Sequence, residues 1–268
     1  MTNLRVGAVL VGLVVAAAVL SFLWTPYDPL LVDPTARLTG PGAAHWLGTD
    51  VFGRDVASQL LVGARTTLFV GVVAVGIAAV LGTPLGILAG MLPGWLGGIL
   101  MRVNDLLLAF PALLLAVMFG AVYGASTLTA MIAIGIATVP SFARIARAGT
   151  LRVMSTEYVL AARAANRHPP AIAGRHVLPN IGGLLLVQAS VSFAIAVLAE
   201  AALSFLGFGT RPPTPTWGRM LQESQQVLYA HPALALWPGL AIGIAVLGFN
   251  LLGDGLRDRL DPRLADAR

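Results

Sequence analysis

Residue types that could carry out chemistry are few in this chain. Its four histidines, His45, His168, His176 and His231, all lie in polar stretches between apolar runs. No HExxH pattern occurs, and no histidine inside an apolar run is available to activate a serine such as Ser126. The chain has no Lys, so it lacks the GxxxxGK loop that holds nucleotide phosphates. We therefore expect no catalytic centre, cofactor site or metal site in this chain.

One ionisable side chain interrupts a long apolar run. Glu200 lies about two thirds of the way along residues 181–208, and an acid at such a depth normally faces a bundle interior or a water-filled cavity. At about 100° per residue, a helical sector of roughly 160° also contains Gln188, Ser192 and Ser204. Two interpretations are open. This side lines or gates a path through the membrane, or Glu200 is hydrogen-bonded between helices and holds the bundle together.

The elements that position these residues are apolar and helical. The 268 residues are 57% hydrophobic and 11% charged, against about 25% charged residues in soluble domains. One helical crossing of a bilayer needs roughly 20 apolar residues. The sequence predicts an all-α integral membrane protein with one domain, residues 1–268, and six transmembrane helices at about residues 6–24, 68–92, 105–122, 128–143, 181–208 and 234–252. A cleaved signal peptide is the alternative for the first run.

The arginines predict the orientation. Of the 17 basic residues, all Arg, the six-span arrangement leaves Arg37, Arg54, Arg65, Arg211 and Arg219 on one side. The other 12 lie on the opposite side, which the positive-inside rule makes cytoplasmic, together with both termini. These are Arg5, Arg102, Arg144, Arg147, Arg152, Arg163, Arg167, Arg175, Arg257, Arg259, Arg263 and Arg268. Anionic lipid headgroups account for this basic face without nucleic acid.

Short-range patterns predict local structure in the loops and spans. Asp50, Arg54 and Asp55 in GTDVFGRD are expected to form a salt-bridged turn that caps a helix beginning near Asp55, in preference to a substrate contact. The stretch RMLQESQQVLYA is expected to form a helix over the mouth of the path. Asp105 is expected to reach Arg102 or the membrane interface. Prolines at positions 84 and 111 are expected to kink their helices.

A conspicuous polar segment is EYVLAARAANRHPPAIAGRHVLPN, residues 157–180, between the fourth and fifth predicted spans. Strong helix formers precede Asn166, where a left-handed cap is expected to end a helix, and Pro169 and Pro170 are typical of a new helix start. The segment is either a solvated basic loop that only enforces topology or a docking element for a soluble partner, in which small alanines permit close approach.

The same segment resembles the EAA loop of permease subunits in ATP-binding-cassette importers, whose pattern is EAA, three residues, Gly, and a spacer to Ile/Val-Leu-Pro. Ala161 and Ala162 match the two alanines, and VLP at 177–179 matches the end. Leu160 stands in place of the usual Glu, for which Glu157 is a nearby substitute, and Asn166 stands in place of Gly. The coupling residues that the resemblance implies, at about 150–180, are Glu157, Ala161, Ala162, Arg163, Asn166, Arg167, Arg175 and Pro179.

Three further stretches resemble the C-type permease subunit of dipeptide and oligopeptide importers: HWLGTDVFGRDVASQLLVGARTTL at 45–68, LSFLGFGTRPPTPTWGRML at 203–221 and FNLLGDGLRDRLDPR at 249–263. The resemblance implies a type I importer in a bacterial inner membrane. A second, related permease would complete the path, cytoplasmic ATPases carrying ATP and Mg would dock on the EAA-like loops, and an extracytoplasmic binding protein would deliver substrate. Alternatives are import of nickel, glutathione or haem, or, from another class, a stand-alone ion-coupled transporter.

Overall fold

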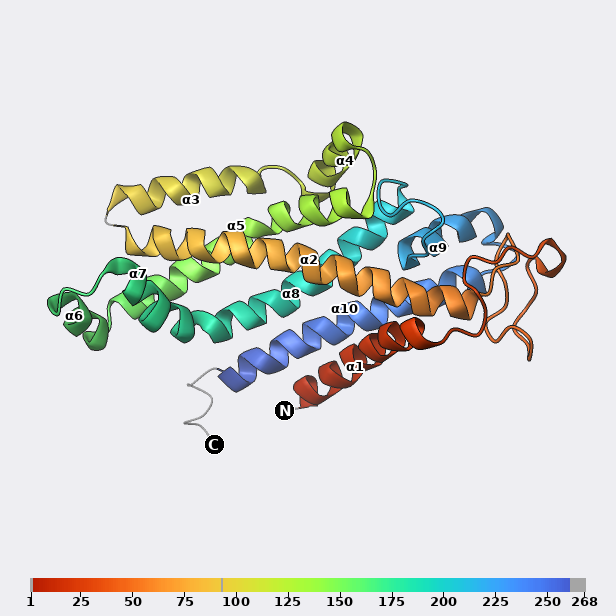
Figure 1. Ribbon diagram of the computed structural model, residues 1–268, viewed down its shortest axis with the longest axis horizontal. Helices are drawn as coiled ribbons and strands as arrows, with labels where there is room; N and C mark the ends of the chain where they lie inside the picture. The colour runs from red at the N-terminus through yellow and green to blue at the C-terminus, as the bar shows by residue number, and fades with distance from the viewer. Residues whose placement is uncertain (1, 93, 261–268) are drawn as a thin grey trace.

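Long helices dominate the computed structural model, which describes residues 2–92 and 94–260. Figure 1 shows them as an elongated bundle. The bundle consists of α1 (Thr2–Leu23), α2 (Val56–Met91), α3 (Trp95–Leu108), α4 (Ala112–Tyr123), α5 (Thr127–Met154), α8 (Leu178–Phe205) and α10 (Ala233–Leu260). The short helices α6 (Glu157–Ala164) and α7 (Pro169–Ile172) lie at one end, the α6 end, and α9 (Trp217–Ser224) lies toward the other, the α9 end. Arg263 and Arg268 of the orientation prediction lie outside the described residues.

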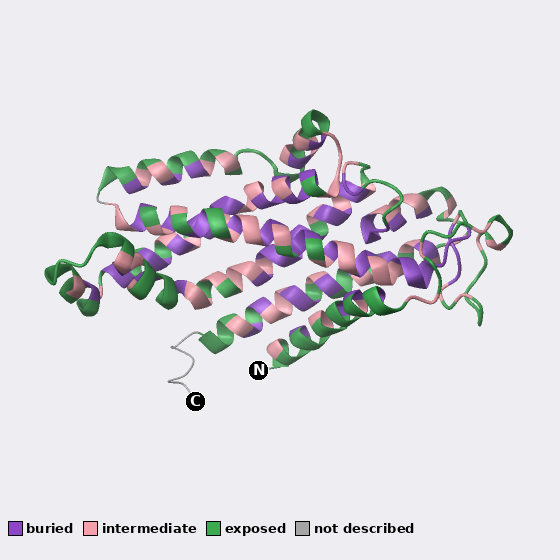
Figure 2. Ribbon diagram, viewed as in Figure 1, coloured by how far each residue is buried: buried purple, intermediate pink, exposed green. Residues whose placement is uncertain are grey.

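The described helices fit a membrane protein. Five helical segments are long and apolar enough to cross a bilayer, and the bent pair α3 and α4 adds a sixth if it counts as one span. Many apolar side chains point outward, including Val72 and Val80 on α2, which are 62% and 70% exposed. Figure 2 shows the buried positions gathered on the faces where helices meet. The predicted all-α membrane fold is confirmed.

Three helices, α2, α5 and α10, extend well beyond the apolar runs that predicted them, and α10 continues to Leu260, past the expected end at 252. The expected second span begins at about residue 68, whereas α2 begins at Val56, because Ser58, Gln59 and Arg65 lower the hydropathy of its first turns without disrupting the helix. At 1.5 Å per residue its 36 residues are about 54 Å long, which exceeds a bilayer core of about 30 Å. Helix α5 likewise continues to Met154, past the expected end at 143, through turns rich in Arg.

The third predicted span, at about 105–122, is divided in the structure. Helix α3 begins at Trp95 and ends at Leu108, and α4 begins at Ala112, with 74° between the two. The cause is Pro111, which has no N–H to donate and disfavours helical geometry in the residue before it. The expected kink at Pro111 is therefore a complete break. Pro84, by contrast, remains inside α2.

Helices α2 and α5 pack along much of their length through glycines on one face of α2. Gly82, Gly86 and Gly90 are spaced four residues apart. A Cβ atom at Gly86 would lie 2.7 Å from the Cβ of Ala146, and one at Gly90 would lie 2.7 Å from the Cβ of Thr150. Lipid tails are as apolar as the side chains, so helix association in a membrane depends on such close packing rather than on hydrophobic burial.

We expect Gly86→Ala to destabilise the bundle by about 1–3 kcal/mol, because the added methyl group meets the backbone of α5. The matched control is Gly76→Ala on the same helix, where an added Cβ meets no atom within 4 Å. Thermal unfolding of both variants in one detergent is the measurement. Equal melting temperatures for the two variants would contradict this account of the α2–α5 contact.

Candidate functional site

The polar segment at the α6 end folds into a compact protrusion. Helix α6 ends in a Schellman motif, in which the Arg167 N–H donates to the Ala162 carbonyl at 3.1 Å and the Asn166 N–H donates to the Arg163 carbonyl at 2.9 Å. Asn166 has a φ of 53°, so it adopts the left-handed conformation expected from the sequence. The cap fixes the direction in which the chain leaves α6.

The next turn of the chain is fixed by proline and by burial. Helix α7 begins at Pro169, as predicted, and a π-helical turn at residues 173–177 joins it to α8. The underside of the protrusion is apolar: Val159, Val177 and Ile172 are 0%, 0% and 2% exposed and pack in a cluster with residues at the end of α5 and the start of α8. The protrusion is therefore anchored to two bundle helices.

The predicted coupling residues lie on the outer side of this protrusion. Ala162 is partly buried, and the other seven are exposed: Glu157, Ala161, Arg163, Asn166, Arg167, Arg175 and Pro179. Small side chains on α6 and basic side chains around it form a surface that a second protein can approach closely. The structure thus brings these residues together at the α6 end, from α6, the turn after it, the π-helical turn and the first turn of α8.

The polar residues of α8 lie mostly inside the protein. Ser192, Glu200 and Ser204 are 1%, 1% and 3% exposed, and only Gln188 is partly accessible. The Gln188 amide donates to the Ser192 hydroxyl at 2.9 Å. In this single chain the polar side of α8 therefore faces neighbouring helices, and Gln188 is its most accessible member.

Glu200 lies where α8, α2 and the start of α9 meet. The Ser204 hydroxyl donates to Glu200 Oε1 at 2.7 Å, and the Thr210 N–H reaches the same hydroxyl at 3.3 Å. The hydroxyls of Thr67 and Thr216 also face the carboxyl group, although Glu200 Oε2 and Thr67 Oγ1 have no partner at normal hydrogen-bonding geometry. Glu200 thus connects α8 with the loop that leads to α9.

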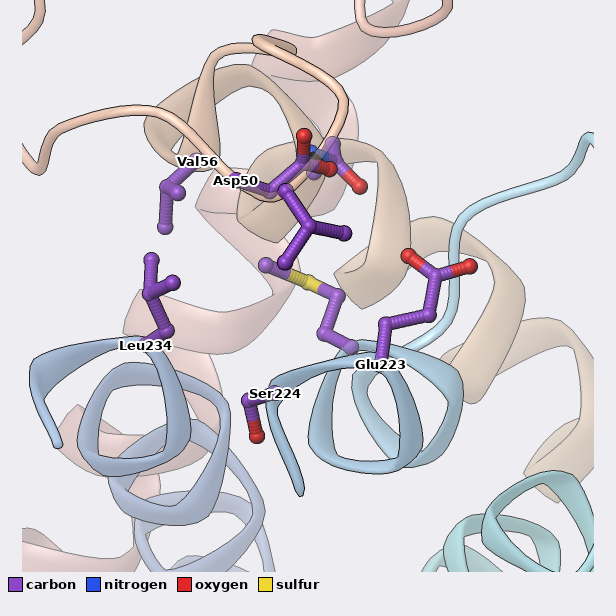
Figure 3. A pocket seen from close by; sticks show the side chains of 8 residues that line it. Asp50, Val56, Glu223, Ser224 and Leu234 are labelled. Atoms are coloured by element: carbon purple, nitrogen blue, oxygen red, sulfur yellow. Dashed lines mark hydrogen bonds between the residues drawn. The ribbon is translucent and has the colours of Figure 1, made fainter. Parts of the chain in front are cut away.

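A cluster of charged side chains lies at the α9 end of the molecule. Asp50 Oδ2 accepts from Arg54 Nε at 2.6 Å and from Gln59 Nε2 at 2.9 Å. Arg54 also forms an ion pair with Glu223 of α9, and Glu223 accepts from Arg219 Nε at 2.7 Å. In Figure 3, Asp50 and Glu223 line the same small cavity, whose volume of about 20 Å³ suits a single water molecule.

This cluster extends the predicted salt-bridged turn. Asp55 caps α2 as expected, since its Oδ2 accepts from the Ser58 N–H at 2.7 Å. Burial lowers the pKa of Arg54, but hydrogen bonds and charges from Asp50 and Glu223 outweigh it and raise that pKa above its ordinary value. Sequence reasoning missed the role of Glu223, which is 169 positions from Arg54; the only local signal was the four-residue spacing of Arg219 and Glu223.

Two further sequence expectations can be compared with the structure. Asp105 pairs with Arg144 of α5 at 2.8 Å, not with Arg102, because α3 packs against α5. The stretch RMLQESQQVLYA, expected to be one helix, is α-helical only to Ser224: α9 begins at Trp217 with Thr216 as its N-cap, and a short 3₁₀ turn at Gln225–Val227 follows it. Within residues 2–92 and 94–260, no group of three or more His, Cys, Asp or Glu side chains is arranged to hold a metal ion.

We expect Arg54→Met to cost about 3–5 kcal/mol, because it leaves two largely buried carboxylates without their shared cation. The control is Arg144→Met, which breaks a pair whose side chains are 54% and 44% exposed and should cost no more than about 1 kcal/mol. Unfolding in detergent measures both. A loss at Arg54 no larger than that at Arg144 would show that the cluster does not hold the α9 end together.

Comparison with known proteins agrees with this architecture. Residues 82–266 match the family model described as "Binding-protein-dependent transport system inner membrane component". The dipeptide transport system permease protein DppC of Alkalihalophilus pseudofirmus is 41% identical, over 97% of this chain and 85% of that protein. The glutathione transport system permease protein GsiD of Pectobacterium atrosepticum is also 41% identical, over 96% of this chain and 87% of that protein.

A third relative and one solved structure complete the comparison. The di/tripeptide transport system permease protein DppC of Pseudomonas aeruginosa is 41% identical, over 97% of this chain and 88% of that protein. An inward-facing structure of the MetNI methionine ABC transporter superposes with a TM-score of 0.63 at 18% identity, over 76% of this chain and 96% of that chain, which shows a shared fold. This chain therefore belongs to the family of inner membrane components of binding-protein-dependent transport systems.

Proposed function

We propose that this chain is a permease subunit of an ATP-driven importer of di- or oligopeptides. The observation that carries the proposal is 41% identity, over nearly the whole chain, to permeases named for dipeptides, di/tripeptides and glutathione. Glutathione is itself a short peptide, so the three names share one chemical class. These relatives favour peptides over the alternative substrates nickel and haem.

In this proposal the chain supplies half of a translocation path, and partner subunits hydrolyse the ATP. We infer a heterodimer with a second, related permease, cytoplasmic ATPases that bind ATP and Mg, and a substrate-binding protein at the α9 end. The absence of Lys, and so of a phosphate-binding loop, supports a non-catalytic subunit without a cofactor of its own. The exposed, anchored protrusion supports a soluble partner at the α6 end.

The arginines support an orientation in the bacterial inner membrane. With the α6 end and both termini in the cytoplasm, Arg163, Arg167 and Arg175 lie on the side that the positive-inside rule favours for basic residues. The Asp50–Arg54–Glu223 cluster then lies outside, where it ties the long loop after α1 to α9.

Coupling follows from how the protrusion is built. An ATPase that closes against α6 pushes on a helix whose end is fixed by the Asn166 cap and whose underside is packed on α5 and α8. Because these contacts are close-packed, a displacement of α6 moves both bundle helices rather than being absorbed by the loop. We propose that α8 borders the path at Gln188, its most accessible polar residue of the four, and that buried Glu200 positions the outer part of the helix.

We expect Ala162→Arg to leave membrane insertion intact and to prevent ATPase binding or uncouple hydrolysis from uptake, because the added bulk fills a surface that must be approached closely. Asn166→Gly is the silent control, since Gly also adopts the left-handed cap. The measurements are co-purification of the ATPases, and peptide-stimulated ATP hydrolysis and uptake in reconstituted membranes. If Ala162→Arg retains binding, hydrolysis and uptake, the protrusion is only a topological anchor and the coupling proposal fails.

We expect Glu200→Gln to preserve assembly while lowering peptide uptake several-fold, because the amide keeps the shape of the side chain and removes its acid group. Glu200→Leu, which also removes the hydrogen bond to Ser204, should additionally weaken assembly. Uptake kinetics and co-purification of the companion permease separate the two effects. Normal uptake by an assembled Gln variant would show that the acid group of Glu200 has no role in transport.

A further inference from the structure

A second cavity, distinct from that in Figure 3, opens beside the protrusion. It is a groove of about 900 Å³ between the last third of α2, α7 and the first turns of α8. Its volume lies at the upper end of the roughly 300–1,000 Å³ typical of small-molecule sites, so it has room for a long ligand. We call it the α2–α8 groove.

The walls of the α2–α8 groove are apolar, and its charges are all of one sign. Val80, Leu88 and Leu178 are among its apolar lining residues and are 70%, 51% and 44% exposed. Arg163 and Arg167 are its charged lining residues. Among the described residues, no acidic side chain lines the groove and neither arginine forms an ion pair.

From this combination we infer that the α2–α8 groove binds an anionic phospholipid. The acyl chains lie against α2 and α8, and the phosphate group is held by Arg163 and Arg167. A guanidinium group pairs with phosphate through two parallel hydrogen bonds, and basic pockets between transmembrane helices on the cytoplasmic side are typical sites for acidic lipid headgroups. A neutral apolar ligand makes no contact of opposite charge with the two arginines, whereas an acidic lipid pairs with both, so the charges favour an acidic lipid.

The proposal assigns different sides of the protrusion to different ligands. Of the predicted coupling residues, Arg163 and Arg167 line the groove and are assigned to the lipid, whereas Glu157, Ala161 and Arg175 do not line it and remain available to an ATPase. The bound lipid would lie between α7 and α2, which are otherwise in little direct contact, and so would support the protrusion from the bilayer side. Acidic lipid is thereby expected to stabilise the α6 end of the chain.

The test uses the full-length chain, purified in a neutral detergent and exposed to phosphatidylglycerol or to phosphatidylcholine. Retained lipid is counted by native mass spectrometry, without ATPases, so failure here would leave the proposed transport function untouched. We expect selective retention of phosphatidylglycerol. Arg163→Gln with Arg167→Gln should weaken it roughly 25-fold, because each basic side chain near anionic lipid contributes about a factor of five.

Two matched controls test whether the loss of lipid is specific to the groove. One removes positive charge elsewhere on the chain, and the other adds a large apolar side chain elsewhere on α2. Arg152→Gln with Arg257→Gln removes two exposed arginines outside the groove and should retain phosphatidylglycerol. Val80→Trp fills the groove with both arginines present and should reduce retention, whereas Val72→Trp, at an equally exposed site on α2 outside the groove, should not.

Three outcomes would overturn the proposal. The first is equal retention of the two lipids by the unaltered chain. The second is an equal loss in the two double-arginine variants. The third is that Val80→Trp leaves lipid retention unchanged but prevents co-purification of the companion permease, which would assign the α2–α8 groove to the interface between subunits.

Discussion

The close contact of α2 with α5 is the constraint on which the other features depend. In a bilayer, apolar side chains gain little by leaving lipid for protein, so two helices stay together only where their surfaces fit. Gly82, Gly86 and Gly90 remove the side chains that would keep α2 away from α5. The ends of α2 and α5 are thereby fixed relative to each other. One end of α2 carries the charge cluster, and α5 leads directly into the protrusion.

The two ends of the molecule are held by opposite kinds of interaction. At the α6 end the protrusion rests on fully buried Val159 and Val177, and its polar groups face outward. At the α9 end, Arg54 is shared between two largely buried carboxylates. An apolar base depends on close packing, whereas a buried ion pair requires specific hydrogen-bonding geometry. The α6 end is therefore held by the fit of apolar side chains, and the α9 end by the geometry of its charges.

Features set by short-range chemistry were predictable from the sequence, and features set by distant contacts were not. The left-handed cap at Asn166, the helix start at Pro169 and the N-cap at Asp55 all follow from neighbouring residues. Hydropathy located the spans but not their ends, because a helix continues into the interface through polar turns such as those that contain Arg65 or Arg147. The pairing of Arg54 with Glu223 depends on how α9 packs, which no local pattern encodes.

The Schellman cap at Asn166 has a consequence for the direction of signalling. Because α6 is capped at Asn166 and its underside packs on α5 and α8, a rearrangement of these two helices that moves the base of the protrusion also moves α6. With ATPases bound there as proposed, substrate arriving at the membrane helices alters nucleotide affinity by the same factor by which nucleotide alters substrate affinity. Under that proposal the protrusion transmits binding free energy in both directions.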